Sequence, residues 1–460
     1  MNLYRIVLPV CLMLGACVPS LTPETPTRAF TATNESALPP MKTFSAPRPD
    51  RVRQSNRDIA RDFLDLTFQL ESGRNLPVLT RFEGPISVRV TGNAPVSLSM
   101  DLNRVLHRLR SEAGMKIAQT NGETANITIQ AVPRSAIRKA LPQAACFVVP
   151  NITQLSQYAS ARRTPRTDWG RLRTREQMAI FVPADAAPQE VRDCLHEELA
   201  QAHGPLNDLY RLPDSVFNDD NVHTVLTGYD MLILRLMYAP ELRSGMTRRQ
   251  VAEVLPALLT RMNPAGEGMA PRRLPTTPRA WVKSIQSALG PGTGPMERRA
   301  AAREALSIAT VMGWQDHRRA FSLYAMGRLT QPYDPAAAQT YFTQADAIYA
   351  RTPHTELHRA YVASQMAAFS LSQGDADRTI ALVSPHLTTA ARHENAALLS
   401  TLMLLRAEAL DLSGRGVEGR AVRLDSLGWA RYGFGADWAV RAKLREIGSL
   451  SPLKGRNGRI

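Results

Sequence analysis

The segment from Cys194 to Asp208 places acidic and amide side chains at the spacing of a metal-dependent hydrolase helix. Such a helix carries His-Glu-x-x-His, because two imidazoles on one face grip a zinc ion while the glutamate activates its bound water. A frame that starts at His196 fails, since Ala200 holds the place of the second imidazole. His203 lies about 10 Å farther along the helix axis, so the two histidines cannot ligate one ion. We expect both to be surface or interface histidines.

Moving the frame by one residue produces a longer match to the metzincin signature, His-Glu-x-x-His-x-x-Gly-x-x-His. In this frame Glu198 holds the general-base position and Gly204 holds the turn position. The three ligand positions and the residue after them hold Glu197, Gln201, Asn207 and Asp208. Farther along, residues 215–217 (Ser-Val-Phe) resemble the metzincin Met-turn with Phe in place of Met. The resemblance implies a metzincin-like scaffold that lacks the histidine ligands.

A closer resemblance lies in residues 194–208, 212–219 and 238–246. These segments resemble domain-of-unknown-function family 2927, which comprises exported proteins and lipoproteins of Gram-negative bacteria. The resemblance covers roughly residues 56–262. The family has no established activity, so the resemblance identifies the domain and leaves its function open.

The residue types argue against a tight zinc site. Carboxylates and amides are oxygen ligands, whereas zinc prefers imidazole and thiolate. We therefore predict no cofactor and no metal, with Glu198 as the candidate catalytic base if any chemistry survives. One alternative is a hard cation such as calcium, held by Glu197, Glu198, Asp208, Asp219 and Asp220. The other is structural: these side chains, with Gln201 and Asn207, hydrogen-bond the loop from 205 to 222 and preserve the cleft.

The order of the predicted elements indicates an α+β or mixed α/β fold for the first half of the chain. Apolar periodicity predicts a helix that begins near Asn56 and is closed by Gly73, and a second helix capped by Asp101. Alternating or continuous apolar runs predict strands at 86–90, 127–129, 146–149 and 178–182. Two more helices are predicted at 188–203 and at roughly 227–238. This twisted mixed sheet with helices forms the metzincin-like domain.

The sequence of the second half of the chain predicts helices, each with small residues along one face. Three similar helix ends occur at 329–331, 371–374 and 412–414, which are offset by 42 and 41 residues. A period near 40 predicts antiparallel helix pairs that stack into an all-α repeat. It is similar to tetratricopeptide-type repeats, although their period is shorter; a plain helical bundle is the alternative.

Composition divides the chain further. The predicted parts are a signal peptide at 1–16, a disordered Pro/Thr/Ser-rich tether at 17–55, the family domain at 56–262, a Pro/Gly-rich linker at 263–297, the helical repeat at 298–450 and a basic tail at 451–460.

The first residues resemble a bacterial lipoprotein signal. Arg5 precedes an apolar run at 6–14 that is too short to span a bilayer, and Leu-Gly-Ala then leads into Cys17. We expect cleavage before Cys17 and acylation of its thiol and amine, which anchors the chain to a membrane. Val18 in place of aspartate favours the outer membrane, with the body facing the periplasm. An ordinary secretory signal is the alternative.

Four cysteines are present: Cys11, Cys17, Cys146 and Cys194. Cys11 leaves with the signal peptide and Cys17 is lipidated, so one pair remains in an oxidising compartment. We predict a disulfide between Cys146 and Cys194. Two buried free thiols are the alternative.

A formal net charge of +15 would ordinarily suggest nucleic acid as a partner. The export signal and the scattered arginines argue against that partner and favour a solvated, arginine-rich surface. We predict a membrane-anchored, non-catalytic binding or scaffold protein that docks a protein partner on its helical repeat. The alternative is an atypical metal-dependent hydrolase that acts on peptide or cell-wall bonds.

Overall fold

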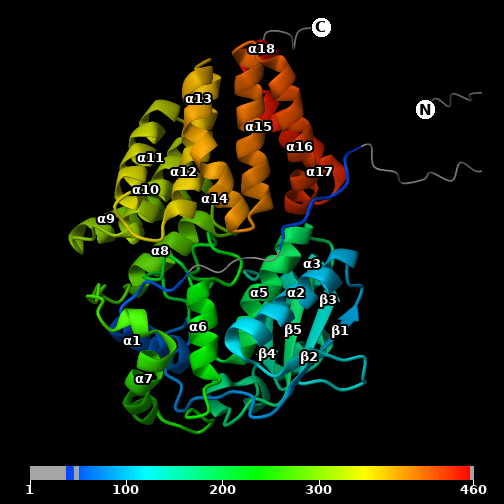
Figure 1. The fold of residues 1–460 in the computed structure, drawn as a ribbon, viewed down its shortest axis with the longest axis vertical. Helices are drawn as coiled ribbons and strands as arrows, with labels where there is room; N and C mark the ends of the chain where they lie inside the picture. The colour runs from blue at the N-terminus through cyan, green and yellow to red at the C-terminus, as the bar shows by residue number, and fades with distance from the viewer. Residues whose placement is uncertain (1–37, 46–50, 456–460) are drawn as a thin grey trace, which may run out of the picture. The chain divides into compact units, whose positions relative to one another are not determined.

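The protein is described here by a computed structural model, which covers residues 38–45 and 51–455 (Figure 1). The predicted signal peptide, the lipidation site Cys17 and the greater part of the tether lie outside the described residues. So does the end of the predicted basic tail. Among the helices that the structure describes, none combines the length and the apolar character needed to cross a membrane.

The described residues form one five-stranded sheet with the order β2-β1-β3-β5-β4. Its strands are β1 (Ile86–Gly92), β2 (Ile117–Gln119), β3 (Ile127–Val132), β4 (Phe147–Pro150) and β5 (Met178–Pro183). All neighbours are parallel except β4, which runs antiparallel to β5. The four predicted strands are confirmed. The short edge strand β2 was not predicted, because only its first residue is buried and three residues show no alternation.

Helices cover both faces of the sheet. Successive residues of a strand point to opposite faces, so β5 contributes side chains to two separate clusters. Ile180 and Val182 belong to the main core, which they share with the helices α2 (Val96–Ala113) and α5 (Pro188–His203). Phe181 belongs to a smaller cluster on the other face. That cluster includes residues of α3 (Arg134–Ala140) and α4 (Leu155–Ala161). Helices α1 (Asn56–Phe68), α6 (Gly228–Met237) and α7 (Arg248–Met262) complete the main core.

The helices predicted at 188–203 and 227–238 are confirmed as α5 and α6. Pro188 starts α5 and Thr227 caps α6 through a capping box with Asp230. Two predicted boundaries are wrong. Helix α1 ends at Phe68, before a turn that contains Gly73. Asp101 does not cap α2, because α2 already begins at Val96.

The C-terminal region is mostly helical (Figure 1). Its longer helices are α9 (Pro295–Val311), α10 (His317–Thr330), α11 (Pro335–Tyr349), α12 (Glu356–Ser372), α13 (Ala376–Val383), α15 (Ala396–Leu412), α16 (Gly416–Phe434) and α17 (Asp437–Gly448). The short helices α14 (Leu387–Arg392) and α18 (Pro452–Gly455) lie among them in the chain. Helices α10, α12 and α15 end where the repeat predicted. Gly374 and Gly414 follow two of these ends with φ of 82° and 78°, a left-handed conformation that favours glycine and stops a helix.

Part of the predicted linker at 263–297 is a packed helix, α8 (Arg279–Leu289). Trp281 of α8 is fully buried, and its indole Nε1 donates to Ser322 Oγ at 2.9 Å. The linker prediction is therefore wrong for this stretch. The Pro- and Gly-rich flanks hid a short amphipathic helix whose apolar side packs on α9 and α10.

Part of the predicted disordered tether is also ordered. In residues 38–45, the Lys42 N–H donates to the Gly428 carbonyl of α16 at 3.0 Å. The Phe44 ring stacks on Trp429 with centroids 4.5 Å apart. This segment therefore lies along α16, which the composition of the tether did not indicate.

The family domain and the helical region share a polar interface. Arg192 of α5 is buried, and its Nη1 donates to the Glu394 carbonyl at 2.8 Å. Asp101 of α2 accepts a hydrogen bond from the Tyr432 hydroxyl at 2.9 Å. Since these groups are buried, the helical region completes the packing of the family domain.

Candidate functional site

The predicted disulfide is present. Cys146, just before β4, is bonded to Cys194 of α5, with a Cα–Cα distance of 6.0 Å. The bond joins the candidate helix to the edge of the sheet. It therefore holds the start of the segment 194–208 in place.

Helix α5 ends on a buried arginine. Arg175 donates from Nη1 to the Gln201 carbonyl at 2.5 Å and from Nη2 to the Gly204 carbonyl at 2.8 Å. The last carbonyls of a helix have no partner within it, so this cation satisfies them and complements the negative end of the helix dipole. The chain is thereby directed into the loop from 204 to 227, which we call the α5–α6 loop.

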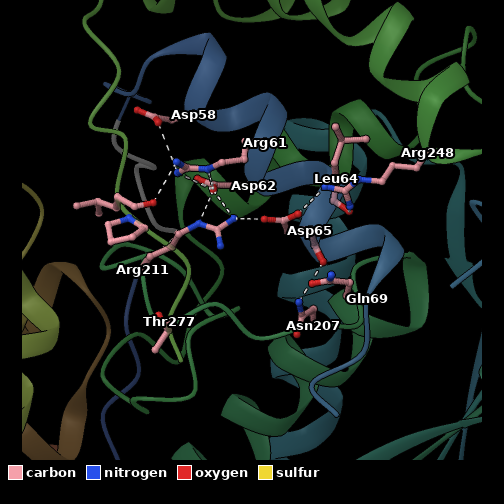
Figure 2. A network of polar contacts seen from close by, with 12 residues as sticks. Asp58, Arg61, Asp62, Leu64, Asp65, Gln69, Asn207, Arg211, Arg248 and Thr277 are labelled. Carbon is pink, nitrogen blue, oxygen red and sulfur yellow. Dashed lines mark hydrogen bonds and ion pairs between the residues drawn. The ribbon is translucent and has the colours of Figure 1, made fainter. Parts of the chain in front are cut away.

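A network of charged groups fixes the α5–α6 loop to α1 (Figure 2). The buried Arg211 guanidinium contacts Asp62 at 2.7 Å and Asp65 at 2.6 Å. The Asn207 amide donates to the Asp65 carbonyl at 3.1 Å. Arg248 reaches the same Asp65 carboxylate from α7 at 2.6 Å. For Asn207 these contacts support the structural alternative: its amide holds the loop.

A pocket of about 440 Å³ opens between this loop, the turn after α1 and helix α8. Its lining includes the carboxylates of Glu71, Asp208 and Asp219 and the guanidinium of Arg279. Asp219 is held by the Tyr210 hydroxyl at 2.9 Å. Two separate parts of the chain, the turn after α1 and the α5–α6 loop, therefore bring acidic groups to one concave surface.

Burial and neighbouring carboxyl groups disfavour the ionised form of the carboxyls in this pocket. Burial raises the pKa of Asp208 well above its usual range, and Glu71 and Glu197 add to the effect. Asp208 and Glu71 are also hydrogen-bonded to each other, as two carboxyls can be when they share a proton. Within the described residues, Asp208 Oδ1 is buried without a hydrogen-bond partner.

The candidate base lies behind the pocket. Glu198 is buried, and burial followed by the charge of Glu197 raises its pKa well above the usual value. Burial raises the pKa of Glu197 to about 8, with Asp219 and Glu71 as the next causes. In the part of the chain that the structure describes, Glu198 Oε2 has no partner. Burial and the neighbouring carboxyls therefore favour the protonated form of both glutamates.

The structure thus brings Glu197, Glu198 and Asp208 into one electrostatic cluster with Glu71 and Asp219. Glu71 was missed, because it lies in a turn after α1 and no local pattern distinguishes it. Gln201 is buried on the same helix, and Asn207 points to α1.

The described residues contain no group of three or more His, Cys, Asp or Glu side chains arranged to hold a metal ion. The two histidines of α5 are buried, which rules out the surface and leaves the interface of the two positions expected for them. His196 Nδ1 accepts the Leu226 N–H at 3.3 Å. His203 Nδ1 lies at the Leu199 carbonyl. Both imidazoles serve the packing of α5 and its loop.

The substitution Glu197→Gln should flatten the pH dependence of stability. A carboxyl whose pKa is raised on folding, here from 4.5 to about 8, stabilises the fold at low pH and loses that contribution as pH rises through this window. Unfolding by urea at several pH values between these limits measures the slope. Equal slopes for the parent and the variant would contradict the burial of this proton. Glu253→Gln, on the exposed side of α7, is the matched control.

Comparison with known proteins supports the resemblance of the domain. Residues 56–257 match the model of the family described as "Protein of unknown function (DUF2927)". This segment is similar to family 2927. The matched residues include the sheet, α5 and the α5–α6 loop. The match ends within α7, so α8 lies outside it. No curated protein and no solved structure matches the chain significantly.

Proposed function

We propose that this chain is a lipid-anchored envelope protein that binds a positively charged ligand in the pocket formed by the family 2927 domain and α8. The observation that carries this proposal is the convergence of Glu71, Asp208 and Asp219 on one pocket. Burial, followed by the charges of Glu71, Glu197 and Asp219, raises the pKa of Asp208, so a bound cation relieves an unfavourable arrangement.

The chain as a whole strengthens the argument. Its net charge is +15, yet this pocket gathers carboxylates. A positively charged protein surface repels cations, so an acidic pocket on such a body favours a specific ligand over a diffuse cloud of counterions. Arg211 and Arg279 also line the pocket, and the charge of Arg279 offsets part of the rise in the pKa of Glu71.

A binding function fits the residue types better than hydrolysis does. Gln201 and Asn207 stand where a metzincin has imidazoles, and amide oxygens are poor zinc donors. Glu198 is buried behind the pocket and is not part of its lining. The anchor at Cys17, the outer-membrane location and a protein partner on the helical region belong to the same proposal.

Calorimetric titration of the purified protein with putrescine, lysine amide, arginine amide and calcium chloride tests this function. Because burial raises the pKa of the carboxyls in this cluster, binding of a cation should release protons, which appears as a dependence of the binding enthalpy on the buffer. Asp208→Asn should weaken binding by about tenfold or more, which corresponds to about 1.4 kcal/mol.

Asp377→Asn, an exposed aspartate on α13, is the matched control and should bind as the parent does. Failure of all four cations to bind would overturn the proposal, as would equal binding by Asp208→Asn. Turnover of a peptide or cell-wall polymer that is lost in Glu198→Gln would establish the hydrolase alternative instead.

A further inference from the structure

The histidines of the helical region are concentrated where this region contacts the α5–α6 loop. The five histidines in this region are His317, His354, His358, His386 and His393. All but His386 contact residues of the loop or lie within interaction distance of them. Histidine is the side chain whose charge changes between about pH 5 and 8, so this placement concerns a physiological range.

Two of these histidines face carboxylates of the loop. His358 Nε2 lies 2.9 Å from Asp220 Oδ2, and both side chains are buried. His354 Nδ1 lies 3.8 Å from Asp214 Oδ2, at the edge of the interface. His317 Nε2 lies 2.7 Å from the Tyr210 carbonyl.

The loop adds a histidine of its own at the centre of the interface. The His223 ring lies 5.0 Å from His393 and 5.8 Å from His358 between centroids. His223 is only 6% exposed, and its Nε2 has no hydrogen-bond partner among the described residues. Three imidazoles are thus packed together where the family domain meets the helical region.

Other charged and titratable groups surround this cluster. The α5–α6 loop contributes Asp214 and Asp220, and the family domain contributes Arg104 of α2 and Arg192 and Asp193 of α5. The helical region contributes Tyr349 at the end of α11, His354 in the turn before α12, Tyr361 of α12 and Glu394 in the turn after α14. Asp193 is paired with Arg192 at 2.6 Å, and Glu394 faces Arg192 and Arg104. These carboxylates therefore already have cationic or imidazole partners, whereas His223 has imidazoles as its ring neighbours.

We propose that these histidines form a clamp that holds the α5–α6 loop against the helical region and releases it on acidification. Protonation of His223 places a cation beside the imidazoles of His358 and His393 in a buried site. The cost of that charge is relieved when the loop moves into water. The clamp exists whether or not the pocket binds a cation, so it goes beyond the proposed function.

The direction of the effect follows from the buried imidazole. Burial lowers the pKa of His223 well below 6.5, and His393 and His358 add to this. A histidine that is neutral in the closed state and titrates normally in the open state stabilises closure fully above pH 6.5. That stabilisation is lost as pH falls. His223 is therefore the histidine through which acidification opens the clamp.

The clamp also bears on the pocket, because Asp208, Tyr210 and Asp219 belong to the same loop. Release of the loop separates the carboxylates of Asp208 and Asp219 from Glu71 and α8. Acidification is therefore expected to dismantle the pocket by a route distinct from direct protonation of its carboxylates.

Hydrogen exchange of the full chain, expressed as protection factors for residues 204–227, tests the clamp. Between about pH 7.5 and about pH 5.5 the opening constant of the loop should rise about tenfold in the parent, by the linkage of one histidine. His223→Gln cannot be protonated and should lose most of this rise. His107→Gln, at an exposed position on α2, is the matched control and should behave as the parent.

An opening constant in the parent that does not change over this range would overturn the clamp, as would a rise of equal size in His223→Gln. If circular dichroism shows that His223→Gln is unfolded, His393→Gln replaces it and should reduce the rise. A full rise in that variant counts against the clamp in the same way. Protection of the loop is measured without ligand, so its outcome is independent of cation binding.

Discussion

Loss of the Cys146–Cys194 bond should lower the free energy of unfolding by about 4 kcal/mol. The bond closes a loop of 48 residues, and the chain-entropy model assigns about this value to a loop of that length. The double variant Cys146→Ala/Cys194→Ala and the reduced parent protein should show the same loss. The reason is that both free the unfolded chain while the buried apolar contacts of α5 remain.

Urea unfolding of the oxidised parent, the reduced parent and the double variant measures this effect. The single variant Cys194→Ala should match the double variant, since neither can form the bond. An unfolding midpoint of the parent that does not respond to reductant would contradict the disulfide, because a structural bond of this kind acts mainly on the unfolded chain.

Replacement of Arg211 by Met should cost about 3 kcal/mol, because it removes the one buried cation that contacts both Asp62 and Asp65. These carboxylates then keep only the more exposed guanidiniums of Arg61 and Arg248. Arg211 and Asp62 are exposed by only 3% and 1%, and they are 2.7 Å apart. Arg211 also joins the α5–α6 loop to α1, so the loop should lose protection from hydrogen exchange before the sheet does.

Arg248→Met is the matched control for this prediction. Arg248 contacts the same Asp65 carboxylate, but its side chain is 44% exposed, so its loss should cost about 1 kcal/mol or less. The double variant Arg211→Met/Asp62→Asn should recover part of the stability, since it removes one of the orphaned charges. Equal losses for Arg211→Met and Arg248→Met would mean that burial does not decide the strength of these pairs.

Much of the family domain could be predicted from periodicity alone. The strand at 178–183 is a short apolar run because both faces of a parallel sheet are covered, and such a run stands out in the sequence. The strand that begins at Ile127 was found from the alternation of Ile127 and Ile129. Helix α5 was predicted to within its boundary residues because Pro188 and Gly204 mark its two ends. The repeat in the helical region was found from its helix ends for the same reason.

The errors share one cause, which is burial that involves distant segments. Asp101 was expected to cap a helix, but it lies within α2 and faces Tyr432 of the helical region. Helix α8 was assigned to a linker, although Trp281 fills a cavity between helices that follow it in the chain. The α5 histidines were left between the surface and an interface because a helical wheel shows faces and does not show what covers them.

The sequence by itself determined the secondary structure around α5, the pairing of Cys146 with Cys194 and the exclusion of imidazole ligands at the metzincin positions. These depend on local periodicity, on the number of cysteines and on side-chain identity. Only the tertiary structure decided that Glu71, Asp208 and Asp219 line one pocket, and that His223 meets His358 and His393. The physical reason is that long-range packing selects which side chains lose water together, and no local pattern records that choice.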